Sequence, residues 1–176
     1  MKKPVLVILL GLFLLPAITS AHGPSRLKMV KEIEINAAPD KVWAIISDFC
    51  SIKVWLPPVK ECESDGTNNP DTIRTLTLEN GEKLREQLLK HQPEKMMYQY
   101  MIDKANVKAV PVASYGSTIM VKANGSGGSI VTWKSGFYRG YMNNNPPPEL
   151  NDEAATKAIA AIYDAGLANI KKLAEQ

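Results

Sequence analysis

Alternating polar and apolar side chains predict a chain built largely from β-strands. Residues 29–35 alternate in this way, which is the pattern of a half-buried strand. Similar runs, bounded by turn residues, predict further strands over 59–63, 73–79, 82–90, 96–102, 115–123 and 129–141. The run 82–90 also fits a helix, because Glu, Lys, Leu and Gln are good helix formers. The Asn80-Gly81 hairpin signal before it favours a strand.

Apolar residues at helical spacing predict helices near both ends of this run of strands. Two short helices follow the first strand: one opens at Pro39, and the next, over 52–56, is ended by Pro57. One long helix is predicted over 151–173. Its apolar face consists of Ala155, Ile159, Ile162, Gly166, Ile170 and Leu173. This order of elements indicates an α+β fold, in which a curved antiparallel sheet wraps around the long C-terminal helix.

Small residues on the long helix bear on what lies beneath the sheet. Ala155 and Gly166 present little side-chain volume on the apolar face. The space that they leave is either closed by tight packing or used as a ligand cavity. The sequence pattern supports both interpretations.

Glu86 is the most informative polar residue of the predicted sheet. A two-residue hairpin loop at Asn80-Gly81 gives the pairs Glu79–Glu82, Thr77–Leu84, Thr75–Glu86 and Ile73–Leu88. This register places Glu86 as a lone carboxylate on the covered face and Arg74 on the solvent face. Burial would raise the pKa of Glu86 and make it a candidate acid, base or hydrogen-bond anchor. Alternatively, Tyr or Thr neighbours or water satisfy the carboxylate, and a one-residue slip would move it to the other face.

Several aromatic and apolar residues are candidates for the interior. Trp133 and Phe137 share one face of the strand 129–141, where they form either core or a cavity wall. Tyr98 and Tyr100 lie in a methionine-rich strand, which provides an adaptable apolar surface. The loop 109–115 is also apolar and would pack down as a lid with or without a ligand.

The N-terminal segment has the features of a secretory signal peptide. Lys2 and Lys3 precede an apolar run from Val5 to Leu15, and small residues lead to a cleavage site after Ala21. The run is shorter than the roughly 20 residues needed to span a bilayer. We therefore expect residues 1–21 to be removed and residues 22–176 to be exported without a membrane span.

Composition and charge exclude some classes of function. The chain has 176 residues, of which 45% are hydrophobic and 22% charged, which are ordinary globular values. Its formal net charge is +3, and two of these charges are Lys2 and Lys3 of the leader. The cleaved chain would thus carry +1. A nucleic-acid-binding function is not expected from this balance.

Two cysteines, Cys50 and Cys62, lie in the exported part of the chain. An even pair in an exported protein favours a disulfide, which would contribute roughly 3 kcal/mol by restricting the unfolded chain. The alternative is a pair of buried, unbonded thiols. Two thiols are too few for a cysteine-only metal site.

Several motifs together resemble the START-like, or helix-grip, superfamily of polyketide cyclases and lipid carriers. The matching residues are Ile35 to Trp43, Ser47-Asp48-Phe49, Trp55-Leu56-Pro57, Ile73 to Leu78, Asn80-Gly81, Glu86-Gln87-Leu88, Tyr98, Pro111-Val112, Tyr115 and Thr132-Trp133. The resemblance implies a single domain over 22–176, with a cavity under the C-terminal helix. The candidate cavity residues are Trp55, Glu86, Tyr98, Tyr100, Pro111, Tyr115, Trp133, Phe137, Ile159 and Ile162. The motifs are specific for the fold and not for a function.

A narrower resemblance concerns the start of the exported chain and the cysteines. The leader, His22-Gly23-Pro24 and the segment Asp48-Phe49-Cys50 with Cys62 are similar to MxaD-type proteins, which accompany methanol oxidation in methylotrophic bacteria. This resemblance implies a non-catalytic periplasmic accessory protein without a cofactor. Its partners would be a quinoprotein methanol dehydrogenase and the c-type cytochrome that accepts the electrons. Relatives often have Trp-His-Pro in place of Trp55-Leu56-Pro57, so any role of that histidine is not expected here.

Two further functions stay open. One is a carrier of a small hydrophobic or lipid-like ligand in the cavity, and the other is a cyclase- or dehydratase-like enzyme that uses Glu86. The only histidines, His22 and His91, make a Ser-His-Asp triad or a metal site improbable. The sequence also has no Walker loop or dinucleotide-binding glycine motif. The sequence therefore predicts no catalytic residue and no metal.

Overall fold

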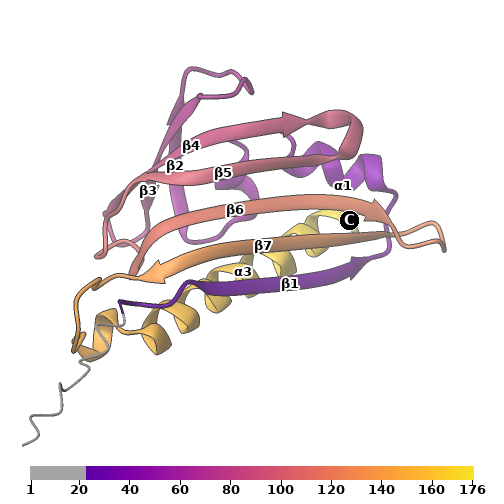
Figure 1. Cartoon of the computed structure of the whole chain (residues 1–176). Helices are drawn as coiled ribbons and strands as arrows, with labels where there is room; N and C mark the ends of the chain where they lie inside the picture. Colours follow the sequence, from indigo (N-terminus) through magenta and orange to yellow (C-terminus); the bar gives the residue numbers. More distant parts are fainter. Residues whose placement is uncertain (1–22) are drawn as a thin grey trace, which may run out of the picture.

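Residues 23–176 are described by the computed structural model, so the predicted signal peptide lies outside the described residues. Seven antiparallel strands form one curved sheet in the order β1-β7-β6-β5-β4-β3-β2, and a long C-terminal helix, α3, runs across its concave face (Figure 1). The strands are β1 Leu27–Ile35, β2 Val59–Ser64, β3 Ile73–Leu78, β4 Lys83–Gln92, β5 Met97–Lys104, β6 Val112–Ala123 and β7 Ser129–Arg139. The helices are α1 Pro39–Ile46, α2 Ile52–Trp55 and α3 Asp152–Ala174, with short 3₁₀ turns at Pro93–Lys95 and Pro148–Leu150. The predicted helix-grip α+β fold is confirmed, including the choice of a strand for residues 82–90.

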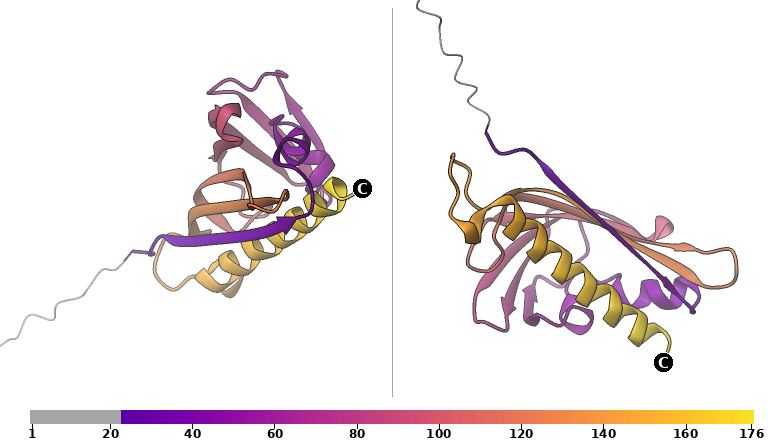
Figure 2. Two further views of the ribbon diagram at one scale, coloured as in Figure 1. Left: turned by 90° about the vertical axis from the view of Figure 1, so that its right-hand side faces the viewer. Right: turned by 90° about the horizontal axis from the view of Figure 1, so that it is seen from below.

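Helix α3 begins and ends where its sequence provides caps. The Asn151 side chain accepts a hydrogen bond of 2.8 Å from the Ala154 amide, which satisfies a free donor of the first turn. Asp152 and Glu153 lie in the first turn and Lys171 and Lys172 in the last, as the helix dipole favours. One face of α3 is buried against the sheet along its length, as the views in Figure 2 show. The helices within residues 23–176 are too short or too polar to cross a membrane.

Helices α1 and α2 lie beside α3 on the concave side of the sheet (Figure 2). Their connection is tied to the sheet by a disulfide between Cys50 and Cys62, whose Cα atoms are 5.7 Å apart. Cys50 follows α1, and Cys62 lies in the edge strand β2. The predicted disulfide is thus present, and it fixes the α1–α2 turn against the edge of the sheet.

Tight packing, and not a cavity, surrounds Gly166 of α3. A Cβ atom at this position would lie 2.8 Å from Cζ3 of Trp133 and 3.0 Å from Cδ1 of Leu56. Trp133 in turn stacks on Tyr163 of α3, with ring centroids 4.0 Å apart and planes within 9°. The small residue therefore lets the helix backbone approach the tryptophan, and the empty space under the sheet lies elsewhere.

The predicted register of the β3–β4 hairpin was wrong by one residue. The observed pairs are Ile73–Gln87, Arg74–Glu86, Thr75–Arg85, Leu76–Leu84 and Thr77–Lys83. The loop has three residues, 79–81, instead of two. The Leu78 amide donates a hydrogen bond to the Glu82 carbonyl across this loop, and Gly81 takes a left-handed conformation with φ of +81°. Glu86 keeps its predicted inward face, but β3 turns over, so that Arg74 faces inward and Thr75 outward.

Replacing Gly166 by alanine is expected to lower the free energy of unfolding by about 1 kcal/mol or more, because a buried tryptophan ring must move. This loss outweighs the gain of up to about 1 kcal/mol that alanine brings to a helix interior. Urea unfolding of Gly166→Ala measures the effect. The reverse change at an exposed position of the same helix, Ala168→Gly, measures the helix-propensity contribution alone. A Gly166→Ala protein more stable than the parent would contradict the packing described here.

Candidate functional site

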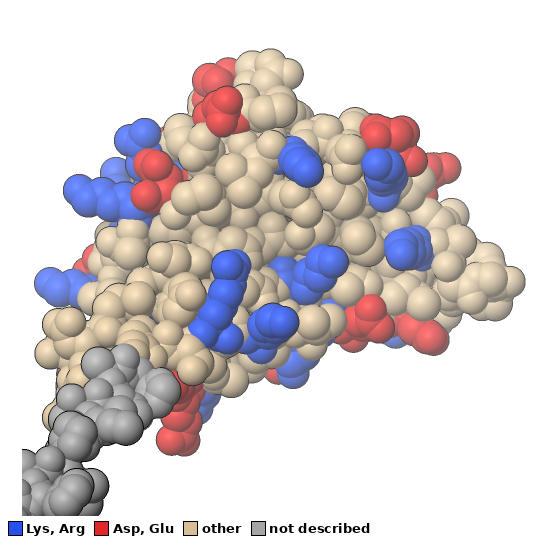
Figure 3. Space-filling view, viewed as in Figure 1, with Lys and Arg blue, Asp and Glu red and all other residues tan. Residues whose placement is uncertain are grey.

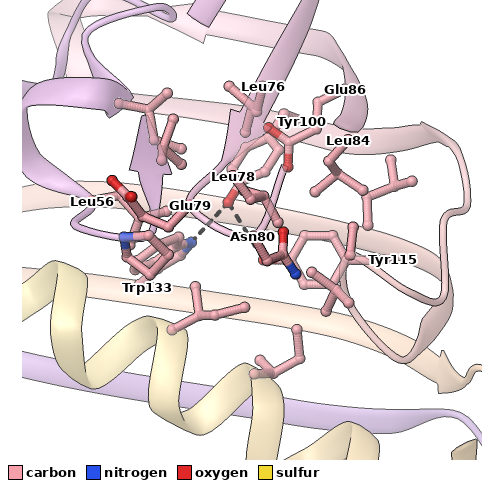
Figure 4. Close-up of a pocket in the computed structure, with 18 residues that line it drawn as sticks. Leu56, Leu76, Leu78, Glu79, Asn80, Leu84, Glu86, Tyr100, Tyr115 and Trp133 are labelled. Atoms are coloured by element: carbon pink, nitrogen blue, oxygen red, sulfur yellow. Dashed lines mark hydrogen bonds between the residues drawn. The ribbon is translucent and has the colours of Figure 1, made fainter. Parts of the chain in front are cut away.

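A cavity of about 290 Å³ lies between the sheet and the N-terminal half of α3 (Figure 4). Its wall is mostly apolar. The lining residues are Ile52, Leu56, Pro58, Val59, Leu76, Leu78, Glu79, Asn80, Leu84, Glu86, Tyr100, Ile102, Ala109, Val110, Tyr115, Trp133, Ile159 and Ile162. The exposed turn residues Glu79 and Asn80 stand at the solvent side, while Glu86 and Tyr100 are buried. The cavity is therefore an apolar pocket with a polar inner end.

Glu86 is not the lone carboxylate that was predicted, because it forms a buried ion pair with Arg74. Oε2 of Glu86 lies 2.7 Å from Nε and 2.6 Å from a terminal nitrogen of Arg74. The Arg74 side chain is completely buried, and the Glu86 side chain is 5% exposed. Both residues occupy paired positions on adjacent strands, so the corrected register brings them together.

Other groups complete the surroundings of Arg74. A terminal nitrogen of its guanidinium donates a hydrogen bond to the backbone carbonyl of Phe49. The guanidinium carbon lies 3.8 Å from the centroid of the Phe49 ring and 5.0 Å from that of Tyr100, which are cation–π distances. Phe49 belongs to the α1–α2 connection beside the disulfide. Arg74 thus joins the β3–β4 hairpin to the helical connection.

Burial and charge act in opposite directions on the Arg74–Glu86 pair. Burial raises the pKa of the Glu86 carboxyl above its ordinary value, and the positive charge of Arg74 opposes that shift. Burial lowers the pKa of Arg74, but the charge of Glu86 and the neighbouring tyrosines outweigh it, so this pKa lies above its usual value. Because arginine keeps its proton in proteins, Glu86 serves as the counter-ion.

A hydrogen-bonded cluster of hydroxyl groups forms another polar part of the interior. Trp133 Nε1 donates to Ser117 Oγ at 2.9 Å and to the Tyr100 hydroxyl at 3.2 Å. The Tyr163 hydroxyl lies 2.8 Å from that of Tyr115 and 3.0 Å from Ser117 Oγ. Figure 4 shows the part of this cluster that reaches the cavity, from Trp133 through Tyr100 to Tyr115. The aromatic wall is held in place by these bonds, and burial raises the pKa of its tyrosines.

Six of the ten predicted cavity residues line this cavity, and four do not. The six are Glu86, Tyr100, Tyr115, Trp133, Ile159 and Ile162. Trp55 packs edge-on against Trp133, and Phe137 packs near Tyr115 on the buried face of β7. Tyr98 contacts Phe49 and lies beside Arg74, where burial raises its pKa to about 12. Pro111 is partly exposed just before β6, whereas its neighbours Ala109 and Val110 reach the cavity.

Of the two histidines, His91 lies among the described residues. His22 lies outside them. His91 forms a 2.8 Å hydrogen bond from Nε2 to the carbonyl of Ser47 and stacks on Trp43, with ring centroids 5.7 Å apart. Across residues 23–176, no three His, Cys, Asp or Glu side chains are grouped to hold a metal ion.

Sequence reasoning missed the other twelve lining residues, and also three polar residues that bond to the site's groups: Arg74, Ser117 and Tyr163. The predicted register placed Arg74 outside, although the match of its charge to Glu86 was a signal for the observed pairing. Tyr163 follows Ile162 on α3, and helical spacing from Ile159 and Ile170 would have placed it on the buried face. Nothing in the sequence distinguished Ser117 from its neighbours.

The fold agrees with the family to which the sequence can be matched. A family model described as polyketide cyclase/dehydrase and lipid transport matches residues 26–175, so the chain belongs to this family. No match was found among curated proteins. The family includes both cyclases or dehydrases and lipid carriers, so membership is compatible with catalysis and with binding.

Solved structures with the same fold extend this comparison. XoxI from Bacillus cereus is 29% identical over 84% of this chain and 94% of its own, with a TM-score of 0.69. A protein of unassigned function from Bacillus thuringiensis is 28% identical over 83% and 97% of the two chains, with a TM-score of 0.68. Norcoclaurine synthase from Thalictrum flavum, solved with dopamine and hydroxybenzaldehyde, is 18% identical over 98% and 96%, with a TM-score of 0.65. The likeness to the synthase shows the fold alone.

The buried ion pair gives a test of stability. Glu86→Gln should lower the free energy of unfolding by about 3 kcal/mol or more, because Arg74 keeps its charge and loses its counter-ion. Replacing both residues, as in Arg74→Met with Glu86→Leu, should recover most of this loss. Urea unfolding at neutral pH measures both effects.

The matched control is Glu61→Gln, which removes an exposed carboxylate of β2 and should change stability by less than about 0.5 kcal/mol. If Glu86→Gln were as stable as the parent, or if the double variant were less stable than Glu86→Gln, the assignment of Glu86 as the counter-ion would be wrong.

Proposed function

We propose that this protein is a non-catalytic binder of one small, mainly apolar molecule held in the cavity under α3. The observation that carries the proposal is the cavity of about 290 Å³, enclosed by aliphatic and aromatic side chains with few polar groups. Ligand sites in proteins are commonly of this kind, and this one lies at the small end of their usual range of volumes. The family's description as lipid transport is in keeping with a binding role.

The polar groups at the inner end define the ligand further. Glu86 is already paired with Arg74, yet its carboxylate borders the cavity and can accept another hydrogen bond. The hydroxyl of Tyr100 lies near it on the same wall (Figure 4). We therefore propose a ligand with an apolar body and one hydroxyl or amino group that donates to this end of the cavity.

The same pair argues against the alternative of a cyclase- or dehydratase-like enzyme. A general acid or base needs a proton that it can exchange near the operating pH. Glu86 instead serves as the counter-ion of a fully buried arginine. It is also the only carboxyl group in the buried part of the cavity wall, because Glu79 lies at the exposed turn.

Native mass spectrometry of protein purified from the periplasm tests the binding function. The parent protein should carry a bound molecule, and Ile162→Trp should release it, because the larger side chain fills the cavity from α3. Ala161→Trp introduces the same side chain at an exposed neighbouring position and should keep the ligand. A ligand-free parent, or a ligand retained by Ile162→Trp, would refute binding in this cavity.

We propose as a second function that the protein is a periplasmic accessory factor of methanol oxidation, as its resemblance to MxaD-type proteins implies. The specific observation in favour is the disulfide between Cys50 and Cys62, the cysteine pair on which that resemblance rests. A disulfide is also typical of an exported protein. In this role the protein favours electron transfer from a quinoprotein methanol dehydrogenase to its c-type cytochrome.

Deleting the gene in its native host should slow methanol-driven reduction of the cytochrome, because the accessory factor acts on electron transfer between the two proteins. Dehydrogenase activity measured with an artificial dye should stay at the parent level. Complementation with the parent gene should restore the rate. Unchanged cytochrome reduction in the deletion strain would exclude this second function, while a parallel loss in the dye assay would indicate an effect on the dehydrogenase itself.

A further inference from the structure

A groove crosses the outer face of the sheet, on the side opposite the cavity. Lys134 and Thr118 border it. Lys134 directly follows the inward Trp133 in β7, and Thr118 directly follows the inward Ser117 in β6, so both point outward because side chains alternate along a strand. The hollow lies at Gly116 of β6, which has no side chain to fill it; at its pairing partner Gly136 of β7 the missing side chain instead makes room for Arg26. Its volume is about 560 Å³.

The charged residues that line the groove are all cations. They are Arg26, Lys28 and Lys134, and no carboxylate among the described residues lines it. The Arg26 guanidinium lies over Gly136, with a terminal nitrogen 3.4 Å from its carbonyl oxygen. Figure 3 shows blue side chains gathered over the middle of this face with no red between them. Near the edges of the same view, blue and red side chains lie side by side, so the group of cations differs from them in its local field.

Apolar side chains accompany the cations. Val30 of β1 is 60% exposed and Leu89 of β4 is 40% exposed, and both line the groove. These are two of the few large hydrophobic residues on the described surface that are exposed to this degree. A concave surface that combines positive charge with exposed apolar groups is typical of a site for another molecule.

We propose that this groove docks an extended acidic segment of a partner protein. Carboxylates of the segment pair with Arg26, Lys28 and Lys134, and separate apolar side chains of the segment pack on Val30 of β1 and on Leu89 of β4, with the hollow at Gly116 between them. A flat bilayer cannot enter a hollow, and three cations are fewer than the 6–10 phosphate contacts of a typical DNA-binding surface. The proposal does not rest on the cavity ligand, because it concerns the opposite face.

The probe for this surface is a capped eight-residue peptide in which glutamate and leucine alternate. Titrating it into the protein should shift the backbone amide NMR signals of Gly116 and Gly136, and added salt should weaken the binding. Lys28→Glu combined with Lys134→Glu should raise the Kd about tenfold or more, because attraction becomes repulsion. The control, Lys53→Glu with Lys157→Glu, makes the same change of net charge at exposed positions of α2 and α3 and should leave the Kd unchanged.

A second variant tests the shape of the groove separately from its charge. The atom nearest to a Cβ built at Gly116 is 3.9 Å away, which is an ordinary contact distance. The Cβ of a Gly116→Val variant therefore fits, and its side chain fills the hollow. This variant should raise the Kd of the peptide about tenfold and leave the thermal unfolding temperature unchanged. Absence of shifts at the two glycines, equal binding of a lysine–leucine peptide, or preferential binding to phosphatidylglycerol vesicles would each overturn the proposal.

Discussion

The buried ion pair between Arg74 and Glu86 is the interaction on which the candidate site depends. A fully buried guanidinium is tolerated only where a counter-ion and hydrogen-bond acceptors surround it, and here Glu86 and the Phe49 carbonyl fulfil these needs. The pair fixes the register of the β3–β4 hairpin and attaches this hairpin to the α1–α2 connection, which the disulfide holds against β2. Of the two residues, Glu86 lines the cavity and contributes a buried charge to its wall. The same two side chains therefore determine the register of the hairpin and the polarity of the inner end of the cavity.

The position of α3 decides how much space remains next to this pair. Gly166 brings the helix backbone against Trp133, and Tyr163 stacks on the same ring while its hydroxyl joins the cluster around Ser117. Nearer the start of the helix, Ile159 and Ile162 border the cavity. Close packing at Tyr163 and Gly166 and an empty volume beside Ile159 and Ile162 are thus neighbours along one helix laid across a curved sheet.

The two faces of the sheet separate two kinds of recognition. The concave face is covered by α3 and suits a small apolar molecule, whereas the outer face carries an open, cationic groove over paired glycines. A protein with this division can hold a ligand and contact a partner at the same time. The proposed ligand cavity and the proposed docking groove are therefore compatible, since they lie on opposite faces of the sheet.

The sequence by itself determined the order of the elements and the α+β class, because periodicity and turn residues are local properties of a chain, and its leader-like segment favoured the disulfide. The inward face of Glu86 was predicted correctly, but from a register that the structure corrects. It did not determine the hairpin register, since a loop of two or three residues at Asn80-Gly81 satisfies the same turn signal. Only the tertiary structure placed Arg74 beside Glu86 and brought Ser117 to Tyr163. It also decided that Gly166 packs tightly while Ile162 borders a cavity, because empty volume depends on how distant segments meet.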